Sequence, residues 1–242
     1  PLDDRSPKDR IERRRIGHPE RVVPLAFLAG ISAGTVLLML PMARAGGMAG
    51  EGGAGFVTAL FTATAALCVT GLIVVDTPSY WSSFGQWVIM PLVQVGGFGM
   101  MTAATLLGLM VNRSFRLRAR LMLQAETHTL GMGDVISVAR LVLLVTLVVE
   151  LTAALALIVR LRTAYELPWA DAAWSGLFHA VSAFNNAGFS IHADGLMRYA
   201  SDGFILTPIM LGIVIGGLGF PVLHDLRRKF RDPNHWSVHT KL

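Results

Sequence analysis

The segment "ALFTATAALCVTGLIVVD", residues 59–76, decides the fold, because its pattern occurs again 117 residues later. The second copy reads "GLFHAVSAFNNAGFSIHAD", residues 176–194. Phe61 aligns with Phe178 and Gly71 with Gly188, so each glycine follows its phenylalanine by ten residues. Both glycines lie beside small or polar residues within an apolar stretch. The pattern indicates a duplicated unit with a special backbone at the same point of each copy.

The composition indicates a membrane protein. Of the 242 residues, 53% are hydrophobic and 15% are charged, and the mean hydropathy is +0.54, whereas a soluble domain carries about 25% charged residues. A membrane-spanning helix needs about 20 apolar residues. Four windows are long enough: Val22–Ala43, Phe84–Val111, Leu141–Val159 and Gly203–Leu223.

The basic residues predict the orientation in the membrane. Residues 1–21 hold seven lysines and arginines, residues 112–140 hold five and residues 224–242 hold five, whereas few lie between these blocks. Such blocks mark the cytoplasmic side. We therefore predict a multi-pass protein of the cell membrane with both ends of this chain in the cytoplasm. The net charge of +5 does not indicate a nucleic-acid partner.

Gly53–Val75 has two interpretations, because it is uncharged and about as long as a membrane span. As a fifth spanning helix it would place the arginines of residues 113–120 outside. A segment that enters from the outside and returns keeps the charges consistent. Backbone that is not helical is tolerated at membrane depth only where protein buries it or where it lines a wet cavity. We therefore expect this segment to line a cavity.

Two short helices are predicted, Phe56–Leu67 and Trp169–Ala183, each followed by a loop with one glycine. A helix of 12 residues reaches about 18 Å, roughly half the membrane. A glycine at such a helix-to-loop transition indicates a backbone conformation that side chains obstruct. The glycine pairs in "VGGFG" (95–99) and "IGGLG" (215–219) favour helix packing, with a hinge or a close approach to the loop as the alternative.

The predicted fold class is an all-α membrane protein with two parallel helix–pore-loop–helix repeats of the potassium-channel type. The predicted divisions follow the charges and the repeat: a basic cytoplasmic tail at 1–21, a first repeat at 22–111, a cytoplasmic linker at 112–133, a second repeat at 134–226 and a cytoplasmic segment at 227–242.

The loop chemistry indicates ion conduction. Residues 68–72 and 185–189 carry no charge, and rings of backbone carbonyls can replace the hydration shell of potassium. Two alternatives remain: an alternating-access carrier, for which inverted repeats would be typical, and a non-conducting assembly protein. The sequence has no nucleophile–base set and no metal-spaced cluster, so we do not predict an enzyme.

The stretches "FTATAALCVTGLIVVDT", "SAFNNAGFS" and the "GGFG" and "GGLGFP" helices resemble the Trk/Ktr/HKT superfamily of potassium transporters over nearly all of residues 22–242. The short basic tail before the first helix is most similar to the bacterial Ktr ion-translocating membrane subunit. The resemblance implies uptake of K⁺ through a selectivity filter, with the dependence on Na⁺ left open. It implies that the filter residues are Cys68, Val69, Thr70, Gly71, Asn185, Asn186, Ala187 and Gly188, whose backbone carbonyls bind K⁺.

The resemblance also implies partners. Ktr-type subunits resemble channels gated by a cytosolic ring of nucleotide-binding proteins, so a nucleotide is expected only on the partner. Arginines of the basic blocks would dock that ring, with attraction to anionic membrane lipid as the alternative: Arg113, Arg116, Arg118, Arg227 and Arg228. Family chains have four repeats and form homodimers of full-length subunits. We expect this sequence to hold the first two repeats, with 227–242 leading to a missing third.

Four ionisable residues have open roles. Glu150 lies mid-helix, either as a functional group or as a paired structural carboxylate. His179 is predicted to be a buried, hydrogen-bonded histidine rather than an ion ligand. Asp76 and Asp194 follow the two loops, where a carboxylate either attracts cations or serves as a helix cap or solvated charge.

Overall fold

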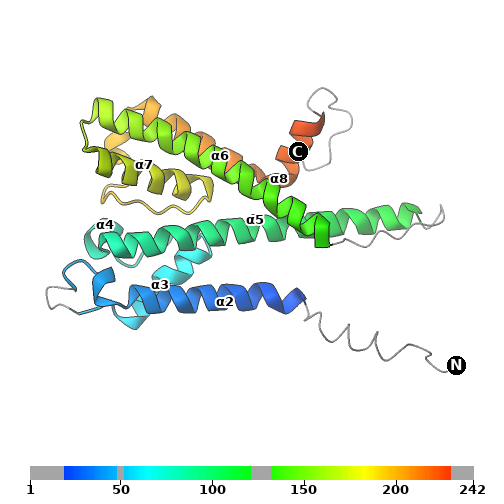
Figure 1. The fold of residues 1–242 in the computed structure, drawn as a ribbon, viewed down its shortest axis with the longest axis horizontal. Helices are drawn as coiled ribbons and strands as arrows, with labels where there is room; N and C mark the ends of the chain where they lie inside the picture. The colour runs from blue at the N-terminus through cyan, green and yellow to red at the C-terminus, as the bar shows by residue number, and fades with distance from the viewer. Residues whose placement is uncertain (1–18, 48–51, 121–131, 230–242) are drawn as a thin grey trace.

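All regular elements are helices in the computed structural model, which describes residues 19–47, 52–120 and 132–229 (Figure 1). Within these ranges there is no β-strand, and one isolated antiparallel bridge joins Arg44 and Trp81. The prediction of an all-α protein is confirmed for the part of the chain that the structure describes.

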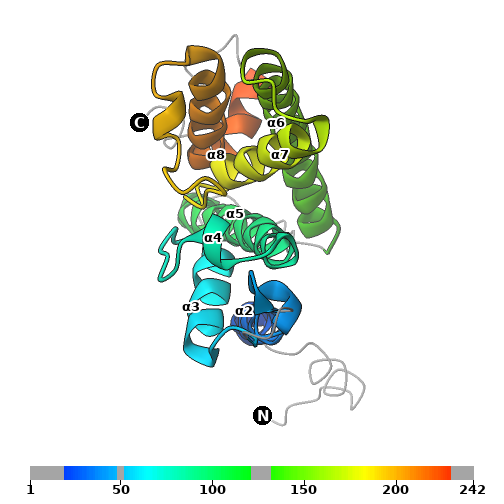
Figure 2. The same ribbon diagram turned by 90° about the vertical axis from the view of Figure 1, so that its left-hand side faces the viewer.

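The helices form two groups of three, seen end-on in Figure 2. The first group consists of α2 (Pro19–Leu38), α3 (Phe56–Leu67) and α5 (Ser83–Arg120), with the short η1 (Pro41–Ala43) and α4 (Thr77–Tyr80) in its loops. The second group consists of α6 (Met132–Ala164), α7 (Trp169–Phe184) and α8 (Gly203–Lys229), with the short η3 (Met197–Tyr199). Each group thus has a long helix, a short helix and a second long helix in that order.

The chain runs into the molecule along each short helix and returns to the same side through the loop that follows. In Figure 1, α2 and α6 begin toward the right, where α5 and α8 end, whereas α3 and α7 begin on the left and stop inside. The chain after each short helix returns to the left. Gly53–Val75 is therefore not one continuous helix, because α3 ends at Leu67.

One helix is long enough and apolar enough to cross a bilayer. Among the described residues, Val142–Ala164 of α6 is long and apolar enough to span, with a mean hydropathy of 2.7. Only 33% of that window is buried, unlike the core helix of a soluble protein. Three shorter apolar stretches are Pro24–Leu38, Phe56–Leu67 and Gly203–Leu218. The prediction of four spans is thus supported directly for one of them.

Alanines allow the short helices to lie deep inside their groups. Ala59, Ala63 and Ala66 of α3 are fully buried against α2 and α5. The same core includes Phe178 of α7 and Ala187 after it, so it joins the two groups. A second core packs α7 between α6 and α8. Small side chains bring backbones close together where there is little hydrophobic drive between helices.

The glycine pairs receive the ends of the short helices. A Cβ on Gly96 of α5 would lie 1.9 Å from the carbonyl oxygen of Leu67, the last residue of α3. A Cβ on Gly216 of α8 would lie 1.8 Å from the carbonyl oxygen of Phe184, the last residue of α7. The glycines therefore serve helix packing and also allow the close approach to the loop that the sequence offered as the alternative. The backbone that they contact is the end of each short helix, where the loop begins.

We expect Gly216→Ala to destabilise the protein by about 2 kcal/mol, because overpacking a close backbone contact costs roughly 1–3 kcal/mol. Gly212→Ala on the same helix is the matched control, since its Cβ would make an ordinary contact of 3.5 Å with the Cβ of Ala183. Thermal unfolding of the detergent-purified protein measures both. Equal unfolding temperatures for the two variants would contradict the close approach.

Candidate functional site

Both short helices end with the same hydrogen-bonded turn. After α3, the N–H groups of Val69 and Thr70 donate to the carbonyls of Ala66 and Ala65 at 3.3 and 3.0 Å. After α7, the equivalent bonds from Asn186 and Ala187 to Ala183 and Ser182 are 3.0 and 2.8 Å long. This pair of bonds is the Schellman motif, which satisfies the last helical carbonyls and turns the chain away from the helix axis.

The two loops share an unusual backbone. Val69 and Asn186 have φ values of 55° and 56°, and Gly71 and Gly188 have φ values of 71° and 70°. Left-handed and other conformations therefore alternate along both loops at equivalent positions. Asparagine and glycine tolerate this region, but a β-branched valine does not adopt it without strain. The loops "CVTG" and "NNAG" thus have one conformation and different side chains.

The structure brings the two loops together. A Cβ on Gly71 would lie 2.8 Å from the carbonyl oxygen of Ala187, and a Cβ on Gly188 would lie 3.3 Å from the Cα of Gly71. Thr70, Asn186 and Gly188 are exposed, whereas Asn185 and Ala187 are buried. The predicted loop residues of both repeats therefore meet at one place, with part of their backbone open to it.

Polar side chains of α7 hold the segment that follows Gly188. Ser182 Oγ donates to the carbonyl of Phe189 at 2.7 Å. His179 Nδ1 lies 2.8 Å from the carbonyl of Ser175, and its Nε2 lies 3.0 Å from Ser190 Oγ. Because a carbonyl only accepts, Nδ1 carries the proton and Nε2 accepts from Ser190. His179 is 7% exposed, so the prediction of a buried, hydrogen-bonded histidine is confirmed.

Asn185 connects the second loop to two other helices. Its Nδ2 donates to Glu150 Oε1 of α6 at 3.1 Å and to Gln94 Oε1 of α5 at 3.2 Å. The same Nδ2 lies 2.9 Å from the carbonyl of Val181. Glu150 is 4% exposed. Glu150 is therefore a buried carboxylate whose partner is a residue of the candidate site, which fits both of the roles considered for it.

A cavity of about 360 Å³ lies beside the second loop. Its lining joins the loop to α8, through residues that include Asn186, Gly188, Phe189, Ile209 and Ile213. Among the described residues, no group of acidic, histidine or cysteine side chains could hold a metal ion.

The outer carboxylates have ordinary partners. Asp194 forms an ion pair with Arg198 at 2.8 Å, four residues along the chain. Asp76 precedes α4 and accepts a hydrogen bond from the hydroxyl of Ser79. Asp194 is therefore a solvated, paired charge.

The predicted docking arginines lie near helix ends. Arg113, Arg116 and Arg118 belong to α5, and Arg227 and Arg228 belong to α8. Their side chains fall outside the part of the chain that the structure describes at the side-chain level. Their docking role stays a prediction.

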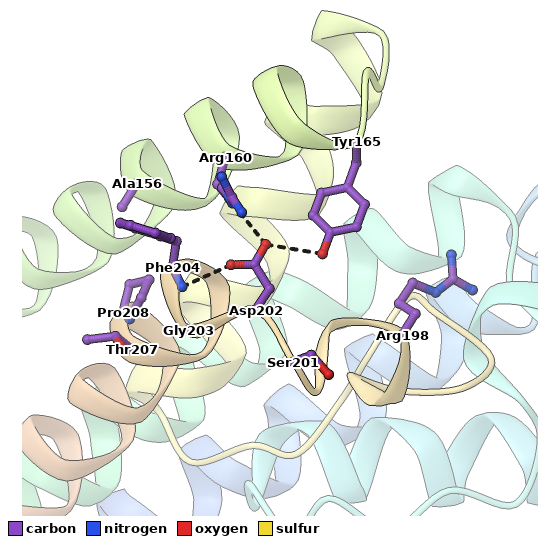
Figure 3. Close-up of a pocket in the computed structure, with 10 residues that line it drawn as sticks. All are labelled: Ala156, Arg160, Tyr165, Arg198, Ser201, Asp202, Gly203, Phe204, Thr207 and Pro208. Atoms are coloured by element: carbon purple, nitrogen blue, oxygen red, sulfur yellow. Dashed lines mark hydrogen bonds and ion pairs between the residues drawn. The ribbon is translucent and has the colours of Figure 1, made fainter.

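Asp202 organises the second group at the start of α8, beside a cavity of about 860 Å³ (Figure 3). Its carboxylate accepts from Arg160 Nε at 2.8 Å, from the Tyr165 hydroxyl at 3.1 Å and from the N–H of Phe204 at 3.0 Å. The last bond caps the start of α8. The hydrogen bond from Arg160 holds the pKa of Asp202 below its ordinary value, and partial burial opposes this shift. An aspartate directly before an apolar helix is the sequence signal that would have identified this cap.

The arrangement suits membrane transport. Two short helices end inside a helical protein, and the loops that follow them meet and present backbone polar groups rather than catalytic side chains. These features define the class of helical membrane transport proteins. The chain belongs to the TrkH family, described as cation transport proteins, whose family model matches residues 33–235. The resemblance seen in the sequence is confirmed, and the family is one of transporters rather than enzymes.

Curated relatives match most of this chain. The Ktr system potassium uptake protein B of Bacillus subtilis is 40% identical over 93% of this chain and 48% of its own length. The protein of the same name from Vibrio alginolyticus is 33% identical over 98% of this chain and 50% of its own length. The potassium/sodium uptake protein NtpJ of Enterococcus hirae is 34% identical over 88% and 46%. The chain therefore spans about half the length of the curated relatives it matches.

We expect acid to weaken the second group through Asp202. Because its pKa is lowered in the folded state, its ion pair stabilises the fold above the ordinary pKa of 3.8. That stabilisation is lost as the pH falls through the lower folded-state pKa. The unfolding temperature of the detergent-purified protein should fall as the pH drops below about 4, and less so in Asp202→Asn. An Asp171→Asn control, at an exposed position of α7, should behave like the unaltered protein, and an equal acid response of Asp202→Asn would contradict the role of this pair.

Proposed function

We propose that this chain supplies part of the pore of a potassium uptake system in the cell membrane, and that residues 68–71 and 185–188 form part of its selectivity filter. The observation that carries the proposal is the alternation of left-handed residues at 69, 71, 186 and 188 in two loops that face each other. Family membership supports a cation as the transported species, and the names of three relatives support potassium.

The alternating backbone suits carbonyl coordination. In an extended strand, successive carbonyls point to opposite sides. When residues with positive and negative φ alternate, the peptide planes between them rotate, so that successive carbonyls can point to the same side. A row of carbonyls on one side replaces the water around potassium without any charged side chain. This explains how "CVTG" and "NNAG" can do the same work with different side chains.

The helix ends add a favourable potential for a cation. The carbonyl end of a helix carries a partial negative charge of roughly half an elementary charge. Both α3 and α7 end at the loops, with Leu67 and Phe184 as their last residues. Two such ends directed at one place attract a cation and repel an anion, which favours cation transport over a non-conducting role.

The orientation and the division of the chain are part of the proposal. We propose two parallel repeats, 22–111 and 134–226, with residues 1–21, 112–133 and 227–242 in the cytoplasm. The common direction of the two helix groups in Figure 1 supports this, and it favours a channel-like pore over a carrier built from inverted repeats. A complete carbonyl ring is built from four loops, so two further loops, and assembly as a homodimer of full-length subunits, belong to the proposed pore.

The proposed system has a cytosolic partner. We place a nucleotide-binding regulatory ring against Arg113, Arg116, Arg118, Arg227 and Arg228, because α5 and α8 end on the same side of the molecule. Two relatives are named as parts of a Ktr system, which supports a multi-component assembly. Anionic lipid is the competing occupant of these arginines.

We expect Gly71→Ser and Gly188→Ser each to lower the preference for K⁺ over Na⁺ by about tenfold, or about 1.4 kcal/mol, because a Cβ meets the opposite loop and left-handed serine is strained. Uptake of the two ions is measured in cells that lack their own potassium uptake, with the protein expressed from its native gene. Gly55→Ser is the control: it lies at the start of α3 with no atom within 4 Å of a Cβ. An unaltered preference in both loop variants would remove the filter proposal.

For the docking proposal, Arg→Glu changes at Arg113, Arg116, Arg118, Arg227 and Arg228 should abolish capture of the purified ring. Arg162→Glu is the control. Arg162 lies in the last turn of α6, away from the ends of α5 and α8, so this change should leave capture of the ring intact. Retention of the ring by the five-fold variant at physiological salt would show that these arginines do not dock it, and liposome binding then tests the lipid alternative.

A further inference from the structure

We propose that Glu150, Gln94 and Gly97 are positioning residues for ion selection, because they fix the side chain of Asn185 and thereby the second filter loop. We call Asn185, Glu150, Gln94 and Gly97 the Asn185 cluster. The inference rests on the proposed filter and names the groups that hold one half of it in place.

Asn185 occupies the point where helix becomes loop. It is the residue after α7, and it directly precedes the left-handed Asn186. Its amide is fixed by acceptors from three elements: Glu150 of α6, Gln94 of α5 and Val181 of α7. Any movement of Asn185 would therefore break bonds to both helix groups at once.

The other side of the Asn185 amide is fixed by shape. A Cβ on Gly97 would lie 1.8 Å from Asn185 Oδ1 and 2.9 Å from its Cβ. Gly97 is thus the surface against which the side chain lies. Oδ1 has no hydrogen-bond partner among the described residues, so its contact with Gly97 is steric.

Because these hydrogen bonds are buried, they favour a single position of the second loop. Asn185 is 6% exposed and Glu150 is 4% exposed. A buried polar group that loses its partner incurs the full cost of desolvation, whereas a solvated group finds water instead. The loop therefore has one low-energy position relative to α5 and α6. Selection between K⁺ and Na⁺ depends on carbonyl positions, because the carbonyls replace hydration shells of different size.

Among the residues that the structure describes, no such cluster surrounds the first loop. The residue that aligns with Asn185 is Cys68, which is half-buried. The bonds around the first loop are within its own segment, such as Thr70 Oγ1 to the carbonyl of Ala65 at 3.5 Å. The two halves of the site are therefore held differently, and only the second depends on a carboxylate of another helix.

The test measures K⁺ and Na⁺ uptake in cells that lack their own potassium uptake, with the protein expressed from its native gene. Glu150→Leu, Asn185→Leu and Gly97→Ala should each lower the preference for K⁺ over Na⁺ by about fivefold or more. The double variant of Glu150→Leu with Asn185→Leu should lose no more than the larger single effect, because both remove one unit. Glu150→Gln keeps an acceptor oxygen and should restore the preference.

Thr146→Val is the matched control. Thr146 lies one turn before Glu150 on α6, is 1% exposed and has a hydroxyl without a partner in the described structure, so this change should leave the ion preference unaltered. A merely structural carboxylate would lower the amount of Glu150→Leu protein in the membrane without changing the preference of what remains, and that result overturns the inference. Additive losses in the double variant overturn it as well.

Two further variants keep the outcome decisive. If Glu150→Leu does not reach the membrane, Gly97→Ala decides, because it displaces Asn185 while the carboxyl stays in place; an unaltered preference there overturns the inference. Gly188→Ser is measured in parallel. A loss of preference in Gly188→Ser without a loss in Glu150→Leu removes only the Asn185 cluster, whereas no loss in Gly188→Ser removes the filter and the cluster together.

Discussion

The structure depends on how two helices can end in its interior. The last carbonyls of any helix lack partners within it, and a buried carbonyl cannot turn to water instead. Here α3 and α7 satisfy them with their own next residues, through bonds from Thr70 and Ala187 back into the helix. Those bonds require a left-handed residue at 69 and 186, and that residue turns the chain back toward the side from which it came. The loop direction and the meeting of the two glycines follow from this one requirement.

The long helices are adapted to the same helix ends. A carbonyl that ends a helix at depth must lie against something, and in both groups it lies against a glycine of the following long helix. This adaptation explains why a glycine pair occurs within α5 and within α8, about thirty residues after the end of each short helix. The same contact therefore packs the long helix against the short one and covers the last carbonyl of the short helix.

Much of this could be predicted from local sequence. The bounds expected for the first short helix, Phe56–Leu67, are those observed, and the second extends one residue further, to Phe184. The conformation of an alanine-rich segment that is followed by a loop glycine depends mainly on neighbouring residues. The tertiary partners of Gly96, Asn185 and Asp202 could not be predicted in this way, because they lie between 29 and 91 positions away. Such contacts depend on how helices pack, which no periodicity in one segment records.

The shared backbone of the two loops has a consequence for the history of the chain. Every residue type supplies the same amide, so a duplicated segment that acts through its main chain can exchange almost all of its side chains and keep its task. Only the residues that set the turn, and the glycines where the backbones meet, are constrained by geometry. The pair "CVTG" and "NNAG" is what such freedom leaves after divergence, and the asparagine tethered in one copy alone is an example of a specialisation that a duplicated ancestor could acquire on one side without disturbing the other.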